Sequence, residues 1–342
     1  MIWGPGMIHY VIYGAGAVGS ALGGALARTG MNATLIARKA HCDAITARGG
    51  LTMVTLEGKQ IQPIRAVQTL KELSLDTRTV IFMTMKATDT IEALDEIMGL
   101  DQSVPVVCWQ NGMGNEDLVA QRFSRVYGGV VRFTATMLTP GEIRYAGPGK
   151  LILGVYPSGL DDLACDMVQD LTAAGFTTLT STRIMDDKWL KLLVNLISCV
   201  RPMLKRTPEE PALRTRIGEH ILREGVAVLN AAGIPAKSTN GTEDSAEAML
   251  EKFSPTLRLA EGEGQGMKLQ NSTWQSLARK SRDLENDWYT GVIIKLGEKY
   301  GIPTPWNRMV LTTLHTIADQ GLGPESVNAE EIVRKGNNEV VE

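Results

Sequence analysis

The chain has 342 residues, of which 44% are hydrophobic and 21% charged, and its formal net charge at pH 7 is −3. That length allows two domains with separate cores, while the near-neutral charge gives no sign of a nucleic-acid partner. No apolar run in the sequence approaches the roughly 20 residues that cross a bilayer. We therefore expect a globular protein that binds neither nucleic acid nor a membrane.

The N-terminus and the cysteines bear on where the protein is found. Residues 1–6 lack the charged and apolar regions of a secretory signal peptide, and Met7, just before the first predicted strand, is expected to be the natural start. Four cysteines are widely spaced: Cys42, Cys108, Cys165 and Cys199. Their spacing favours reduced thiols over a disulfide framework or a zinc site. We expect a cytoplasmic protein without a bound metal.

A strand, a tight turn and a helix are predicted in succession near the N-terminus. The β-branched and aromatic run His9–Tyr13 leads into a glycine-rich turn, and small residues then continue at helical spacing. Gly14 allows the sharp turn, Gly16 lets a pyrophosphate approach the main chain, and Gly19 lets the helix pack on the sheet. The predicted dinucleotide site, with the pyrophosphate at the helix N-terminus, consists of Gly14, Ala15, Gly16, Ala17, Val18 and Gly19.

The next predicted strand, at 32–37, is followed by two cations. A site for NAD usually has Asp or Glu about 20 residues after the glycines, where it binds the ribose hydroxyls. This chain has Arg38 and Lys39 instead, and arginine can bind a 2′-phosphate through a bidentate fork. We therefore predict NADPH as the cofactor, with Arg38 on its 2′-phosphate. The alternative is that Arg38 simply points into water.

Two further apolar runs, at 79–85 and 105–109, are typical of parallel strands buried on both faces. In such sheets a ligand lies beyond the carboxyl ends of the strands. Lys86 follows the first run and Gln110-Asn111-Gly112 follows the second, so we expect these residues to contact cofactor or substrate. The alternatives are a solvated loop lysine and an ordinary Asn-Gly turn.

The remaining pattern divides the chain in two. Glycine and proline turns between 128 and 155 predict antiparallel strands at the edge of the sheet, and 160–182 predicts a last helix and strand. Strand signals then fade, and helices are predicted at 186–195, 212–232, 245–253, 276–300 and 306–320, with a loop at 261–266 and a frayed tail at 337–342. We predict an α/β Rossmann-type dinucleotide-binding domain over 7–182 and an all-α domain over 183–336.

The reduction of a carbonyl group by hydride transfer needs a proton donor for the oxygen. The histidines lie in no recognisable catalytic context, so lysine is the better candidate. Lys191 and Asn195 are four residues apart and therefore share one face of the first helix of the second domain, where we expect them to face the cleft. Lys188 competes for the role, but it lies nearer an acidic first turn that we expect to be exposed. For any one of these lysines, a solvated surface residue is the alternative.

A second polar constellation is Asn271-Ser-Thr-Trp-Gln-Ser276, followed by Glu285. Hydroxyl and amide side chains just ahead of a predicted helix either cap that helix or bind a small carboxylate. Glu285 is expected one or two turns into the helix, and the pattern leaves open whether it faces the cleft or solvent.

Several motifs now stand in a fixed order: the turn at 14–19, Lys86, 110–112, 191–195, 272–276, Glu285 with Gly291, and 301–305. In order and spacing they resemble the ketopantoate reductase family over nearly the whole chain. Members are NADPH-dependent 2-dehydropantoate 2-reductases, which reduce ketopantoate to pantoate for pantothenate and coenzyme A synthesis. The resemblance implies a Rossmann domain and a helical domain like the C-terminal domain of 6-phosphogluconate dehydrogenase.

The resemblance also implies roles for individual residues. Lys191 would be the general acid that protonates the nascent hydroxyl, and its charge would offset the negative charge that develops on oxygen. Glu285 would engage the substrate hydroxyl and count among both the catalytic and the cofactor-binding residues. Lys86 would lie near the nicotinamide ribose. Three residues would bind substrate, with Asn111 also reaching the cofactor: Asn111, Asn195 and, through the substrate carboxylate, Ser272.

Three features depart from the family pattern. Ser198 and Cys199 stand where members usually carry a second amide, Ser276 replaces a common Asp, and 201–206 is unusually basic, either a solvated face or an attraction for an anionic substrate. An oxidoreductase of the same family acting on another 2-oxo or 2-hydroxy acid is therefore an alternative. A β-hydroxyacid dehydrogenase, an opine dehydrogenase and a non-catalytic NADPH sensor are weaker ones. We expect a small 2-oxo acid as substrate and either a monomer or a homodimer.

Overall fold

The computed structural model describes residues 7–147, 149–239, 245–252 and 269–339, and these residues form two compact units. The first unit contains residues 7–110, 114–147, 149–185 and 269–270. The second contains 111–113, 186–239, 245–252 and 271–339. The short segment Asn111–Met113 therefore belongs to the second unit, although it comes soon after a strand of the first.

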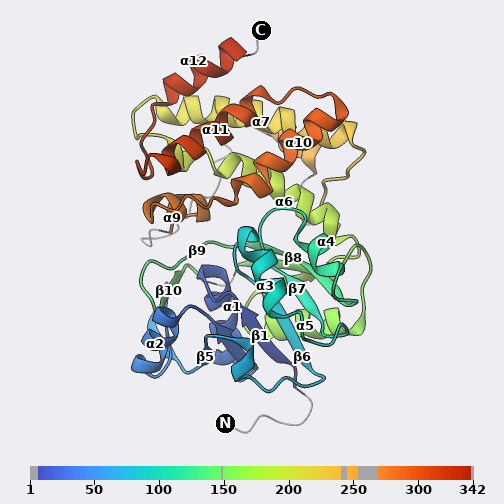
Figure 1. The fold of residues 1–342 in the computed structure, drawn as a ribbon. Helices are drawn as coiled ribbons and strands as arrows, with labels where there is room; N and C mark the ends of the chain where they lie inside the picture. The colour runs from blue at the N-terminus through green and yellow to red at the C-terminus, as the bar shows by residue number, and fades with distance from the viewer. Residues whose placement is uncertain (1–6, 148, 240–244, 253–268, 340–342) are drawn as a thin grey trace. The chain divides into compact units, whose positions relative to one another are not determined.

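The first unit is built on an eight-stranded sheet of order β12-β11-β8-β7-β6-β1-β2-β5 (Figure 1). Every neighbouring pair is parallel except β8 and β11, which are antiparallel. The strands are β1 (His9–Tyr13), β2 (Asn32–Ile36), β5 (Arg65–Val67), β6 (Thr79–Met83), β7 (Val106–Cys108), β8 (Val126–Arg132), β11 (Lys150–Val155) and β12 (Thr177–Thr180). The predicted dinucleotide-binding class of fold is confirmed.

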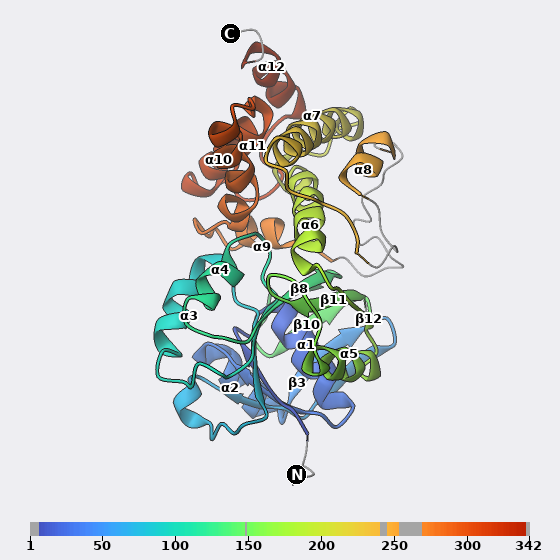
Figure 2. The same cartoon turned by 90° about the vertical axis from the view of Figure 1, so that its right-hand side faces the viewer.

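Helices cover both faces of this sheet (Figure 2). Side chains alternate along each strand, so Tyr10 and Ile12 of β1 enter one core while Val11 and Tyr13 enter the other. The first core is closed by α1 (Ala17–Arg28), α2 (Lys39–Arg48) and α5 (Asp162–Ala173), and the second by α3 (Thr90–Glu96) and α4 (Asn115–Ala120). Burial on both faces explains why the central strands are continuous apolar runs.

A second, four-stranded sheet of order β4-β3-β10-β9 corrects one prediction. The segment 128–155 was expected to extend the edge of the main sheet throughout, but only β8 and β11 belong to that sheet. The strands of the small sheet are β3 (Leu51–Thr55), β4 (Gly58–Gln62), β9 (Ala135–Thr136) and β10 (Glu142–Tyr145). The pairing of β10 with β3 joins segments about ninety residues apart, which local sequence pattern cannot reveal.

The second unit is helical, as predicted. Its helices are α6 (Ile184–Ser198, whose first two residues belong to the first unit), α7 (Glu210–Ala231), α8 (Ala246–Lys252), α9 (Ser272–Ala278), α10 (Thr290–Tyr300), α11 (Pro305–Asp319) and α12 (Ala329–Glu339). The single helix predicted at 276–300 is wrong. Lys280 has a φ of 53° in the left-handed region, which ends α9, and a 3-10 turn, η4 (Glu285–Trp288), precedes α10.

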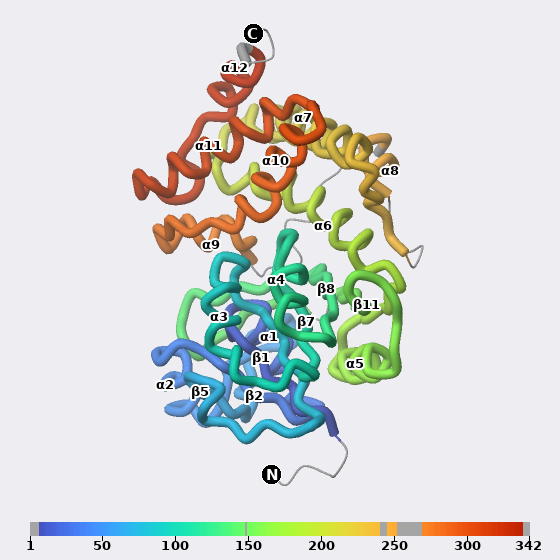
Figure 3. The backbone as a smooth tube through the Cα atoms, turned by 45° about the vertical axis from the view of Figure 1, so that its right-hand side comes forward, coloured from blue at the N-terminus to red at the C-terminus, as the bar shows by residue number. Residues whose placement is uncertain are grey.

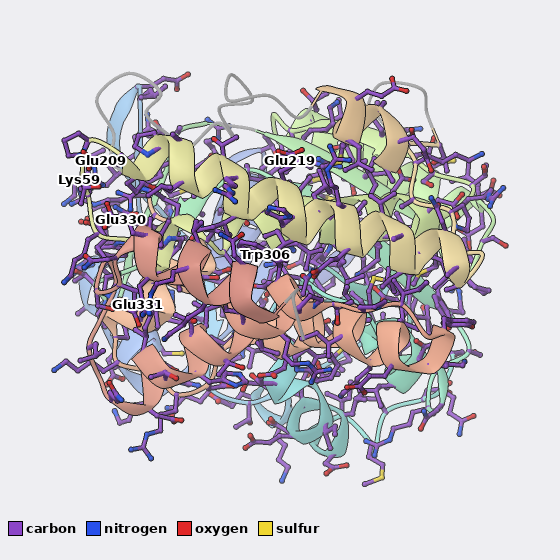
Figure 4. The ribbon with its side chains drawn as sticks, turned by 90° about the horizontal axis from the view of Figure 1, so that it is seen from above. Lys59, Glu209, Glu219, Trp306, Glu330 and Glu331 are labelled. Carbon is purple, nitrogen blue, oxygen red and sulfur yellow. The ribbon has the colours of Figure 1, made fainter. Side chains whose placement is uncertain are left out.

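Trp306 at the start of α11 organises the packing of the helical unit, in which α7 lies alongside α11 and α12 (Figures 3 and 4). The Trp306 ring stacks on His220 of α7 at 4.2 Å between centroids, and a Cβ on Gly336 of α12 would lie 2.6 Å from it. Glu224 accepts hydrogen bonds from the backbone N–H groups of Trp306 and Asn307, both at 2.9 Å. Its carboxylate thus satisfies N–H groups at the start of α11.

Two other predictions concern the later part of the chain. The predicted loop at 261–266 lies outside the described residues. A frayed tail beginning at Asn337 is wrong for residues 337–339, because α12 continues through Glu339; Ile332 and Val333 anchor that helix by burial. Among the described residues, no helix is long and apolar enough to cross a membrane.

Candidate active site

Two of the three glycines in the turn after β1 are required by packing. Gly14 has a φ of +91°, and a Cβ there would lie 2.5 Å from the backbone nitrogen of Met85. A Cβ on Gly19 would lie 2.3 Å from Thr84 Oγ1, which donates a hydrogen bond to the Gly14 carbonyl at 2.9 Å. These two glycines therefore set the turn and the close approach of α1 to the sheet.

Gly16 differs from its neighbours, because a Cβ there would meet only the Gly14 carbonyl oxygen, at 3.9 Å. Protein packing thus gives no reason for glycine at this position. Gly16 is also the N-cap of α1 and, as glycine, supplies no side-chain acceptor to the first N–H groups of the helix. Open space beside a helix N-terminus is the arrangement that accommodates a phosphate group, so these residues fit a dinucleotide.

The residues after β2 place exposed cations near the start of α2. Arg38 is the N-cap of α2, its side chain is 94% exposed, and its Nη2 atom lies 4.0 Å from Asp89 Oδ2. Lys39 pairs with Asp43 one turn later, at 2.8 Å. Such an exposed and weakly paired guanidinium can exchange its carboxylate neighbour for an anionic ligand. This geometry suits a 2′-phosphate.

The residues after β6 and β7 have different environments. Lys86 is half-buried and is the N-cap of a 3-10 turn, η2 (Ala87–Asp89). Gln110 is only 4% exposed, and its amide donates to Thr90 Oγ1 at 2.7 Å, which in turn donates to Asn115 Oδ1 at 2.8 Å. Gln110 therefore belongs to a buried network that ties α3 to α4.

Asn111 and Asn195, predicted separately, are brought together in the second unit. Asn195 Nδ2 donates to Asn111 Oδ1 at 3.4 Å. The segment Asn111–Met113 is fixed on η4, since Met113 N donates to the Trp288 carbonyl at 3.0 Å and a Cβ on Gly112 would lie 2.6 Å from that same oxygen. Gly112 has a φ of +82°, so both its backbone conformation and its close contact require glycine.

The start of α6 corrects one step in the choice of lysine. The acidic first turn was expected to be exposed, yet Asp187 is fully buried, Asp186 is 6% exposed and Lys188 only 4%. Asp187 Oδ2 accepts a 2.6 Å hydrogen bond from the Thr239 hydroxyl, which explains its burial. Lys191 is half-buried and lies one turn before Asn195. Exposure therefore does not disfavour Lys188, and the distinction rests on the position of Lys191 in the family motif.

The segment around 271 has a structural role that sequence had left open. Asn271 caps α9 by accepting from the Trp274 N–H at 2.9 Å, and its amide donates to the Ser198 carbonyl at 2.9 Å. The capping interpretation therefore holds for Asn271 itself. Ser272 is exposed in the first turn of α9. The Asn271 amide joins the start of α9 to the end of α6, and so brings Ser272 near the Asn195 end of that helix.

Glu285 is buried, with 9% of its surface exposed, and it begins η4 rather than lying inside a helix. This answers the question that the sequence left open, since Glu285 does not face solvent. Because Trp288 of the same turn holds the 111–113 segment, Glu285 and Asn111 are carried by two segments in direct contact.

The models of one protein family match both parts of the chain. The model described as "Ketopantoate reductase PanE/ApbA" matches residues 10–158, and "Ketopantoate reductase PanE/ApbA C terminal" matches residues 183–318. The chain belongs to the ketopantoate reductase family. Members use NADPH, and the chain is thus an NADP-dependent oxidoreductase acting on a CH–OH group.

Individual relatives agree with this membership. The 2-dehydropantoate 2-reductase of Pyrococcus horikoshii is 28% identical over 306 residues, 86% of this chain and 93% of that protein. A PanE/ApbA family ketopantoate reductase from Ralstonia eutropha is similar in structure, with a TM-score of 0.75 and 27% identity over 92% of this chain and all of that one. A D-mandelate dehydrogenase bound to NADH and anilino(oxo)acetate has a TM-score of 0.74 at 22% identity, covering 92% of this chain and 99% of that one, which shows the shared fold alone.

Ser198 and Cys199, which depart from the pattern of the ketopantoate reductase family, lie at the end of α6. Ser198 Oγ donates back to the Asn195 carbonyl at 3.1 Å, and Cys199 Sγ donates to the Leu196 carbonyl at 3.0 Å. Burial raises the pKa of the Cys199 thiol to about 12, although Thr290 and Asn286 beside it act in the opposite direction. Cys199 is therefore a neutral thiol in a buried polar cluster.

The same cluster holds two polar groups to which sequence reasoning assigned no role. Asn286 and Thr290 are each 1% exposed, and neither the Asn286 amide nor the Thr290 hydroxyl has a hydrogen-bond partner of normal geometry among the described residues. Ser276, the other departure, is also buried, at 3%. The signal available was Asn286-Asp287 directly after Glu285, but nothing local indicates that Asn286 packs against Cys199.

The basic segment 201–206 is not a simple solvated face. The Arg201 side chain is 13% exposed and lies 3.3 Å from Glu325, which also pairs with Arg206 at 3.2 Å. Glu210 lies 4.0 Å from Arg201 as well. Arg201 is therefore a largely buried structural residue, whereas Arg206, with its side chain 66% exposed, and Lys205 form a solvated face beside it.

Proposed function

We propose that this protein reduces 2-dehydropantoate (ketopantoate) to pantoate with NADPH, in pantothenate and coenzyme A synthesis. The observation that carries the proposal is the pairing of Asn111 with Asn195 one turn from Lys191 in the second unit. Two amides and a lysine beside one another suit an oxygen-rich substrate whose carbonyl must gain a proton. The names of the relatives in the same family support this choice of substrate.

We assign cofactor binding to residues 7–182 and substrate binding and proton transfer to 183–336, with Asn111 as an exception in sequence position. The glycine turn would bind the pyrophosphate through backbone N–H groups. Arg38 would bind the 2′-phosphate and so select NADPH over NADH. Lys86 would lie near the nicotinamide ribose, and Glu285 would also bind the cofactor.

When bound, NADPH supplies a hydride to C2 of the substrate. Lys191 donates a proton to the C2 oxygen as negative charge develops there, and its own charge stabilises that oxygen before the proton moves. Ser272 binds the substrate carboxylate, and Asn111 and Asn195 hold the substrate in place. Glu285 accepts a hydrogen bond from the substrate hydroxyl. The site therefore recognises the length of the substrate as well as its 2-oxo acid end.

A second candidate is reduction of a different 2-oxo acid by the same chemistry. It is favoured by the buried cluster at the end of α6, where Cys199 stands in place of an amide and the Asn286 amide lacks a partner of normal geometry. A substrate with a side chain unlike that of ketopantoate would leave the reaction unchanged and alter only the fit.

The test is the rate of NADPH oxidation by purified protein with ketopantoate, beside a panel of other 2-oxo acids and with NADH in place of NADPH. The proposal expects ketopantoate with NADPH to give the highest kcat/KM of the panel. A higher kcat/KM for another 2-oxo acid selects the second candidate. NADPH binding without turnover of any 2-oxo acid contradicts both and leaves the sensor.

We also propose the cytoplasm as the location, because all four cysteines are free and three of them are buried, which suits a reducing compartment. A monomer or homodimer remains the proposed assembly. Sedimentation of the purified protein distinguishes the two, and a tetramer or larger assembly contradicts both.

A further inference from the structure

His41 lies at the centre of a chain of hydrogen bonds in the first unit. The Gly141 N–H donates to His41 Nδ1 at 2.8 Å, His41 Nε2 lies 3.1 Å from Ser20 Oγ, and Ser20 Oγ donates to the Ala15 carbonyl at 3.2 Å. Because Nδ1 accepts the Gly141 N–H, the proton of the neutral imidazole is on Nε2 and is donated to Ser20. The chain of bonds therefore ends on a carbonyl of the glycine turn.

The backbone of His41 is hydrogen-bonded to Arg38, the proposed 2′-phosphate-binding residue. His41 N and Cys42 N both donate to the Arg38 carbonyl, at 2.9 and 3.2 Å, so His41 lies in the first turn of the helix that Arg38 caps. The imidazole thus connects the start of α2 to α1 and to the turn before it, and α1, α2 and β10 can be followed in Figure 1. His41 is the residue where the two connections meet.

The far end of the hydrogen-bond chain is held firmly against α2. Gly141 has a φ of +77°, and a Cβ there would lie 2.7 Å from Arg48 Nη1 and 2.8 Å from Ala44 Cβ. Arg48 Nη1 also donates to the Pro140 carbonyl at 3.1 Å. The loop before β10 therefore packs directly on α2 and gives the imidazole a fixed partner. His41 itself is 5% exposed and Ser20 is fully buried, so water does not compete for these bonds.

We propose that His41 is a positioning residue for the cofactor, which fixes the separation between the pyrophosphate-binding turn and the 2′-phosphate-binding Arg38. The inference rests on the proposed use of NADPH. A ligand that bridges two anion sites gains affinity from both only when the protein holds them at the spacing of the ligand. Weakening the hydrogen bonds of His41 leaves each site able to bind a phosphate, but it reduces the extra affinity of a ligand that binds both sites.

The test compares ligands that reach one site or both. Adenosine 2′-monophosphate reaches only the Arg38 site, whereas 2′,5′-ADP and NADPH also reach the turn. We expect His41→Gln and Ser20→Ala each to raise the Kd for NADPH and for 2′,5′-ADP about tenfold, the effect of losing one buried hydrogen bond. The Kd for 2′-AMP should stay within about twofold of wild type, because the Arg38 site itself is intact.

His9→Gln is the matched control. His9 is also a buried histidine of the first unit, 9% exposed, and its Nε2 bonds to Thr34 Oγ1 at 3.0 Å with no link to the turn. The His9→Gln variant should be less stable than the wild type and should bind NADPH with unchanged affinity. Ser20→Ala keeps the test valid if the His41 variants do not fold, since alanine suits the interior of α1.

Three results would overturn the inference. The first is an unchanged Kd for NADPH in His41→Gln and Ser20→Ala, and the second is an equal rise in the Kd for 2′-AMP and for 2′,5′-ADP in these variants. The third is an equal rise in the Kd for NADPH in His9→Gln. These are read against the wild type. A wild type that binds no NADPH contradicts the proposed function and this inference with it. A wild type that binds NADPH, beside variants that bind it equally well, contradicts the inference alone.

Discussion

The two units present their functional groups in different ways. In the first, the proposed pyrophosphate site is one contiguous turn whose backbone, rather than its side chains, meets the ligand. In the second, the proposed substrate site gathers side chains from 111–113, α6, the start of α9 and η4. A backbone site constrains residue size over a short stretch, while a side-chain site depends on long-range packing. Substitutions should therefore affect binding in the first unit and chemistry in the second.

The largest effect should come from Lys191→Ala. Loss of a positioned general acid lowers kcat by about 10²–10⁴-fold, while the Kd for NADPH should change by no more than about twofold because the turn is untouched. Steady-state rates and a fluorescence titration of NADPH measure the two quantities. Lys295→Ala, at an exposed lysine of α10, is the control and should keep full activity. A Kd that rises in step with the loss of kcat would contradict the division between the units.

The glycines of the turn separate folding from binding within the first unit. Gly14→Ala should lower the free energy of unfolding by about 1–3 kcal/mol, because alanine is strained at a positive φ and meets Met85. Gly16→Ala should change that free energy by less than about 1 kcal/mol, since its Cβ enters open space. Gly16→Ala should nevertheless raise the Kd for NADPH about tenfold or more, because the Cβ occupies the space needed by the pyrophosphate. Urea unfolding and NADPH titration decide this, and unchanged binding by Gly16→Ala would count against the site.

A smaller and more selective effect is expected at Arg38. Removing one charge-assisted contact with the 2′-phosphate should raise the Kd for NADPH about tenfold to a hundredfold, while NADH binding stays unchanged. Arg78→Ala, at an exposed arginine of the same unit, is the matched control. Equal losses for NADPH and NADH in Arg38→Ala would show that Arg38 supports the fold and does not select the cofactor.

Much of the first unit could be predicted from sequence because its signals are local. The run at 9–13, the glycine spacing and the apolar strands report directly on burial and backbone geometry, and each predicted element was found. The small sheet was missed because β3 and β10 are distant in sequence. In the second unit, α6, α7, α8 and α11 were predicted, whereas α12, the break at Lys280 and the burial of Lys188 were not. Helical periodicity reports neither a single residue that changes backbone conformation nor the tertiary packing that buries a charged side chain.

The smallest effect concerns pH and applies to the fold as a whole. Burial lowers the pKa of His9, His41 and His220 below the ordinary value of 6.5. The unfolded chain then binds more protons than the folded one below that pH, so the free energy of unfolding should fall as the pH falls from 7.5 to about 5.5. Urea unfolding across that range measures the slope, and His9→Gln with His41→Gln should flatten it. A stability that rises toward pH 5.5 would contradict the neutral assignment of these imidazoles.

The most direct test of the central claim is the fate of the hydride. NADPH that carries deuterium in the transferred position at nicotinamide C4 is incubated with ketopantoate and the wild-type protein, and the product is examined by mass spectrometry. The account predicts pantoate with one deuterium, bonded to C2, and a hydroxyl proton that comes from Lys191 and exchanges with water. Pantoate without deuterium at C2, or labelled NADPH that remains unoxidised while bound, would contradict it.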